Sequence, residues 1–174
     1  MDTKEFQRQR KQILEECYRE DPETAGWVKT KRILWRITAG YFILHMVIEF
    51  FVMLQMMFLD DLGREVFKLL FQLLLLFISI NPERSWRNSL LLYLLALANF
   101  VLLLISAENM LGTLPYISDR PLMGAMMLME VLIPFLLLAL AIYLTAIPKH
   151  RELSERAWEI CKKSMEGFHD AMNR

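Results

Sequence analysis

Five polar side chains stand inside otherwise apolar stretches of this chain, and their types are those that hold protons or bind cations. They are His45, Glu49, Gln72, Asn99 and Glu130. Two carboxylates in surroundings that exclude water cannot both ionise at little cost unless a protonated imidazole or another cation lies beside them. A cluster of this kind holds the groups that a proton-coupled or cation-coupled carrier requires.

The surrounding stretches have the length and composition of membrane-crossing helices. The chain has 174 residues, of which 55% are hydrophobic, and its charged residues gather near the two ends and in short connections. An apolar helix of about 17 to 25 residues crosses a hydrocarbon core. Four runs qualify, and they cover residues 33–59, 62–80, 88–107 and 122–147. We expect an all-α integral membrane protein with an antiparallel, up-and-down bundle of four transmembrane helices.

The second run is the weakest of the four. Arg64, Glu65 and Lys68 occupy its first turns, and their charged ends would have to extend toward the lipid headgroups. If this run does not cross, the sides of the membrane are exchanged for every later part of the chain.

A count of depth places the five polar residues near one level. With a rise of about 1.5 Å per residue, His45 lies at the middle of its run and Glu49 about 4 to 5 Å outward. Gln72 and Asn99 fall near the middle of their runs, and Glu130 lies about 7 Å outward. An ionised carboxylate that faces lipid costs about 2.5 to 3.5 kcal/mol or more. We therefore expect the five side chains to converge inside the bundle.

Two interpretations of the cluster remain open. In the first it serves transport, with Glu49 and Glu130 as coupling groups and His45 as their proton partner. In the second it is a hydrogen-bonded knot that sets helix register, since interhelical polar contacts contribute about 0.6 kcal/mol on average without a further role. Pro134, one turn after Glu130, lacks a backbone N–H and favours a kink at the same level.

The basic residues that flank the runs predict the orientation. With four crossings, three basic groups share one side, whereas the two opposite loops, 60–65 and 108–120, hold only two arginines. By the positive-inside rule that shared side is cytoplasmic. We expect a multi-pass protein of the plasma membrane with both termini in the cytoplasm. The basic groups are Lys29, Lys31, Arg32 and Arg36, then Arg84 and Arg87, then Lys149 and Arg151.

The two polar ends of the chain, residues 1–32 and 148–174, are expected to form cytoplasmic amphipathic helices around the transmembrane domain at 33–147. In the C-terminal segment apolar residues recur at intervals of three, four and seven, which is typical of one helix face. Either the two segments pack on each other or on the membrane surface, or this stripe docks a partner. The stripe consists of Leu153, Ala157, Ile160, Cys161, Phe168 and Met172.

Composition excludes several classes of function. The formal net charge is zero, so nucleic-acid binding has no electrostatic support. Cys17 and Cys161 are far apart and have no metal-ligand spacing, so we expect no metal site and no cofactor. Methionines near the outer ends of the first and fourth runs would suit a soft ion such as Cu(I), but Met more commonly fills space. The chain has no GxSxG, HExxH or P-loop motif, so we do not expect an enzyme.

Two hypotheses of function follow. The first is an accessory or regulatory membrane subunit that acts by helix contacts, with a second copy or another membrane protein as its partner within the lipid bilayer. The second is a small proton-coupled or cation-coupled transporter that uses the intramembrane carboxylates, as a dimer because four helices enclose little volume.

Overall fold

The described part of the chain is almost entirely helical and contains no strand. The structure is a computed structural model that describes residues 3–56, 62–113 and 120–172, without the side chains at 3–7, 9, 10, 55, 56, 62, 64, 65, 108, 109, 113 and 166–172. The helices are α1 (Thr3–Glu20), α2 (Pro22–Met56), α3 (Leu62–Ile80), α4 (Leu91–Thr113), α5 (Pro121–Thr145) and α6 (Pro148–Met172). A short 3-10 helix, η2 (Trp86–Leu90), precedes α4. The expected all-α class is confirmed for the described residues.

Three of the helices are long and apolar enough to cross a membrane, which suggests a membrane protein. They cover Pro22–Leu54, Trp86–Ala107 and Pro121–Thr145 among the described residues. α3 has the expected bounds, but its apolar part is the shorter stretch Val66–Ile80.

α2 begins at Pro22, so the predicted start of the first apolar helix at Ile33 is not a helix boundary. Asp21 caps the helix: its carboxylate accepts from the backbone N of Thr24 at 3.1 Å and from the Thr24 hydroxyl at 2.6 Å. Pro22 suits the first helical position because its missing N–H would have no partner there. The resulting helix has 35 residues and is about 52 Å long, well beyond a hydrocarbon core of about 30 Å.

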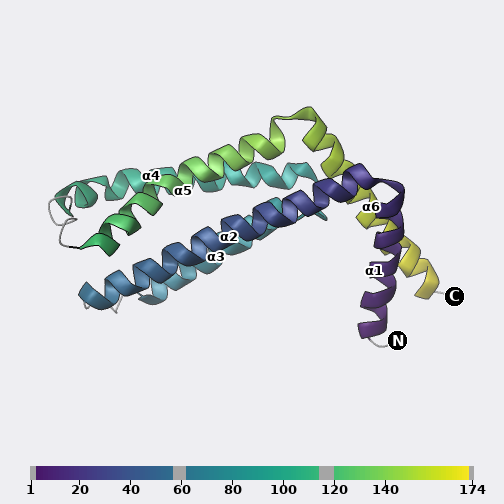
Figure 1. Cartoon of the computed structure of the whole chain (residues 1–174), viewed down its shortest axis with the longest axis horizontal. Helices are drawn as coiled ribbons and strands as arrows, with labels where there is room; N and C mark the ends of the chain where they lie inside the picture. The colour runs from purple at the N-terminus through teal and green to yellow at the C-terminus, as the bar shows by residue number, and fades with distance from the viewer. Residues whose placement is uncertain (1–2, 57–61, 114–119, 173–174) are drawn as a thin grey trace.

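The four long helices form two hairpins, α2 with α3 and α4 with α5 (Figure 1). Successive helices run in opposite directions, as the up-and-down order predicts. Contacts of α2 with α5 and of α3 with α4 hold the hairpins together. α1 and α6 lie side by side at one end, where both termini are found (Figure 1).

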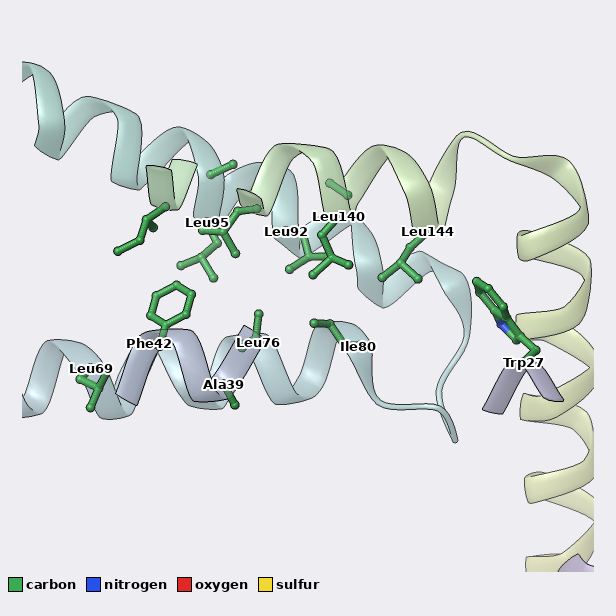
Figure 2. Packing of buried hydrophobic residues seen from close by; sticks show 14 of the residues in the cluster. Trp27, Ala39, Phe42, Leu69, Leu76, Ile80, Leu92, Leu95, Leu140 and Leu144 are labelled. Atoms are coloured by element: carbon green, nitrogen blue, oxygen red, sulfur yellow. The ribbon is translucent and has the colours of Figure 1, made fainter. Parts of the chain in front are cut away.

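The buried core lies between the two hairpins. Figure 2 shows Phe42, Leu76 and Ile80 facing Leu92 and Leu140 across this space. Large apolar side chains also cover the outside, and Phe67 and Ile105 are 71% and 72% exposed. Because exposed apolar surface of this extent is rare on proteins that face only water, the outer surface suits lipid.

α6 is attached to the polar end of α2 by side-chain contacts. The indole Nε1 of Trp27 donates to the Ser154 hydroxyl at 2.9 Å, and its ring stacks on His150 with centroids 4.3 Å apart. Lys149 forms an ion pair with Glu23 at 2.5 Å. These contacts fix α6 at an angle to the hairpins, as Figure 1 shows.

The expected partner-docking stripe on α6 is instead used inside the chain. α6 packs against α1 and α2, and Leu153, Ala157 and Cys161 are buried there. Ile160 is half-buried, and the side chains of Phe168 and Met172 lie outside the described residues. The three buried residues are not available to a partner, because the chain's own helices cover them. Of the two interpretations of this stripe, packing on the chain itself is the one supported.

We predict that Asp21→Ala lowers the free energy of unfolding by about 0.5 to 2 kcal/mol, because the cap of α2 is lost. Hydrogen bonds from Thr24 lower the pKa of Asp21 from 3.8, so the ionised carboxylate stabilises the fold. This contribution is complete above that ordinary pKa and disappears as the pH falls through the lower pKa of the folded state. SDS titration in mixed micelles, followed by circular dichroism, measures the free energy of unfolding. Glu20→Ala is the control, and equal losses in both variants would contradict the cap.

Candidate functional site

A cavity of about 300 Å³ lies between the two hairpins, within the apolar length of the helices. All four long helices contribute to its wall. The five polar residues singled out from the sequence, His45, Glu49, Gln72, Asn99 and Glu130, all line it. Their convergence is therefore a feature of the fold, because one face of each helix points to the same space.

α2 contributes the imidazole and one carboxylate. His45 and Glu49 are separated by four residues, which places their side chains on neighbouring turns of one helix face. His45 Nδ1 lies 3.8 Å from Glu49 Oε2, a separation that makes an ion pair when the ring is protonated. The two side chains are only 9% and 14% exposed. Burial of both groups makes the charge on one depend on the charge of the other.

The amides of Gln72 and Asn99 join the two hairpins. Gln72 Nε2 donates to Asn99 Oδ1 at 3.0 Å, and Asn99 Nδ2 donates to the Leu95 carbonyl at 2.8 Å. Both residues are 9% exposed. Because α3 belongs to one hairpin and α4 to the other, this pair sets their register as well as lining the cavity.

α5 contributes the second carboxylate, Glu130, which is half-buried. The preceding residue is tied to α2, since the Tyr41 hydroxyl donates to the Met129 carbonyl at 3.0 Å. Pro134 lies within α5 and is buried. Its ring supplies no N–H to the carbonyl of Glu130, so the helix is locally weakened beside the carboxylate. The hydrogen bond from Tyr41 holds this part of α5 against α2, next to Glu130.

Sequence reasoning missed two polar residues of the cavity, Lys68 and Ser106. We expected Lys68 to extend toward the headgroups, but its side chain is half-buried and lines the cavity. Helical spacing contained the information, because Lys68 precedes Gln72 by four residues and Ser106 follows Asn99 by seven. The cavity thus combines two carboxylates, one ammonium group and one imidazole.

Most of the methionines near the far end of α5 are buried. Met123, Met127 and Met129 are buried in α5, whereas Met57 lies outside the described residues. Among the described side chains, His, Cys, Asp and Glu form no group of three that could hold a metal ion. Packing is the role that burial supports for the α5 methionines.

A larger cavity of about 780 Å³ lies at the polar end, between the 81–88 connection and α6. Its acidic groups already have contacts. The Ser85 hydroxyl donates to Glu155 Oε1 at 2.6 Å, and the Cys161 thiol lies 3.8 Å from Glu83 Oε2. Nearby, burial raises the pKa of Tyr18 to about 12, and Cys161 and Glu83 add to the effect, so its phenol stays neutral at physiological pH. The contacts around this cavity connect α6 to the 81–88 connection, so we assign the cavity a structural role.

No protein-family model, curated protein or solved structure matches this chain. The cavity between the hairpins is therefore interpreted from its own chemistry. Its groups can bind and release a proton, and they can surround a small positive charge with carboxylate and amide oxygens.

We predict that Gln72 and Asn99 are coupled by about 0.6 kcal/mol, with an upper bound of about 1.7 kcal/mol, as for other interhelical polar pairs. The measurement is a double-mutant cycle of Gln72→Ala and Asn99→Ala, each unfolded by SDS titration in mixed micelles. Additive losses, with no coupling beyond error, would show that the two amides do not join the hairpins in the folded protein.

Proposed function

We propose that this chain is a small membrane transporter that exchanges protons for a small cation through the cavity between its two hairpins. The observation that carries the proposal is that Glu49, Glu130, Lys68 and His45 all line one cavity within the apolar length of the helices. Ionisable groups at such positions are costly and commonly mark the path of an ion or a proton.

The charges of the cavity support a cation as the cargo. Two carboxylates and one ammonium group leave one negative charge when His45 is neutral. A proton on His45, or one monovalent cation in the cavity, restores neutrality. Proton and cation then compete for the same negative charge, and this competition is the basis of exchange.

The alternative role, an accessory or regulatory subunit, depends on exposed faces. The α6 stripe no longer supports it, because Leu153, Ala157 and Cys161 are buried within the chain. α4 still has an apolar outer face that could contact lipid or a partner. On it Leu94, Leu97 and Leu104 are 64%, 59% and 60% exposed. A second copy of the chain that packs on this face would also enlarge the enclosed volume of a transporter.

We propose a topology with four membrane crossings, of which α3 is the second. The protein lies in the plasma membrane, and both of its termini face the cytoplasm. The basic residues in the first half of α2, those of the segment between α3 and α4, and those at the start of α6 support this orientation. The arrangement of α1 and α6 at one end of the hairpins is consistent with it (Figure 1).

We predict that cysteines introduced at residues 60 and 118 react with an impermeant maleimide in intact cells, whereas Arg84→Cys reacts only after permeabilisation. The background is Cys17→Ser with Cys161→Ser. If α3 does not cross, residue 84 lies outside and residue 118 inside. Labelling of Arg84→Cys in intact cells would therefore contradict the four-crossing topology.

We predict that Glu49→Gln and Glu130→Gln each reduce cation-driven proton flux by more than about tenfold, the loss that corresponds to 1.4 kcal/mol of binding. The measurement uses proteoliposomes loaded with a pH-sensitive dye and imposed Na⁺, K⁺ or tetramethylammonium gradients. Glu159→Gln, which removes an exposed carboxylate from α6, is the matched control.

The outcomes separate the two roles. Flux in the wild type that is lost in both cavity variants and retained in Glu159→Gln supports exchange. Equal flux in wild type and both cavity variants contradicts it. If wild-type vesicles show no flux in any of the gradients, the accessory role is favoured instead.

A further inference from the structure

A third pocket, of about 290 Å³, lies where the polar part of α2 meets the end of α3. α2 supplies Arg32, Trp35 and Arg36, and α3 supplies Phe77. The three α2 residues share one helix face because they are separated by three and four positions. The segment 81–83, which follows α3, closes the pocket.

The two arginines bring positive charge to the pocket. Arg32 and Arg36 are exposed, and neither forms an ion pair with the described residues. Arg156 on α6, in contrast, pairs with Asp21, Glu23 and Glu152. A guanidinium stays charged at every physiological pH, and its planar fork fits phosphate oxygens.

Glu83, the acidic residue of the pocket, also contacts α6. Glu83 Oε2 lies 3.8 Å from the thiol of Cys161 on α6. Trp35 also lines the pocket, and its indole Nε1 is buried without a hydrogen-bond partner among the described residues. The groups of the pocket that can bind an anion are therefore the two guanidinium groups. The pocket is thus equipped for an anion that accepts hydrogen bonds.

An apolar track leaves the same pocket along α3. Phe77 packs edge-on against Trp35, with centroids 5.8 Å apart and planes at 79°. Leu74 and Leu70 continue its helix face toward the other end, and the three side chains are 46%, 55% and 59% exposed. A soluble phosphate would use only the charged part. A lipid would use both parts, because its headgroup joins an anion to acyl chains.

We propose that this pocket binds the headgroup of an anionic phospholipid, with an acyl chain along Leu74 and Leu70. Basic pockets between helices at the cytoplasmic face of a membrane bind such headgroups. The pocket also touches a joint of the fold, because the buried amine of Lys31 donates to the carbonyl of Asn81 at 3.2 Å, and Asn81 lines the pocket. The bound lipid therefore holds α2 and the end of α3 together. This proposal is independent of transport through the other cavity.

The test is native mass spectrometry of the full chain, released from micelles that contain equal amounts of phosphatidylglycerol and phosphatidylcholine. We expect the wild type to retain phosphatidylglycerol with about tenfold preference, and Arg32→Gln/Arg36→Gln to lose that preference. Arg8→Gln/Arg19→Gln removes two exposed arginines from α1 and is the charge-matched control, expected to behave as the wild type. Circular dichroism verifies that each variant is folded.

Three results would overturn the proposal: no preference in the wild type, equal loss in the α1 control, or displacement of the lipid by millimolar inorganic phosphate. The last result would assign the pocket to a soluble anion.

Discussion

Ionised groups are poorly solvated within the apolar length of these helices, and the arrangement of the hairpins depends on this constraint. Glu49, Lys68 and Glu130 come from three different helices, yet all line the same small cavity. Each would be costly against lipid, and each gains neighbours of opposite charge or hydrogen-bonding amides where it lies. The polar cavity and the apolar exterior are thus two results of one solvation preference.

Packing adds the precision that solvation lacks. Lipid tails are as apolar as leucine, so close fit and interhelical hydrogen bonds hold such helices together. Phe42 and Leu76 meet the facing hairpin in the core (Figure 2). The Gln72 and Asn99 pair bridges the hairpins at the cavity. An amide pair is directional, so it distinguishes one helix register from the next, which leucine contacts do less strictly.

Much of this could be predicted from the sequence, for physical reasons that differ by residue. The bounds of α3 followed from its apolar run, and the depth count brought His45 and Asn99 to one level because helical rise is constant. Lys68 was misplaced, because a long cationic side chain can reach either the headgroups or the interior, and only tertiary packing decides. The continuity of α2 from Pro22 was missed because hydropathy changes at residue 33 without a helix breaker. The use of the α6 stripe was left open, since amphipathicity does not identify what covers it.

An unbroken α2 has a mechanical consequence. Trp27, held by Ser154 of α6, and His45, at the cavity wall, belong to one rod and are about 27 Å apart along its axis. A straight helix turns about its axis as a stiff body, so torque applied by α6 at the polar end rotates the imidazole and its neighbouring carboxylate together. A molecule that tilts α6 would in this way change the orientation of His45 and Glu49 in the cavity without touching either residue.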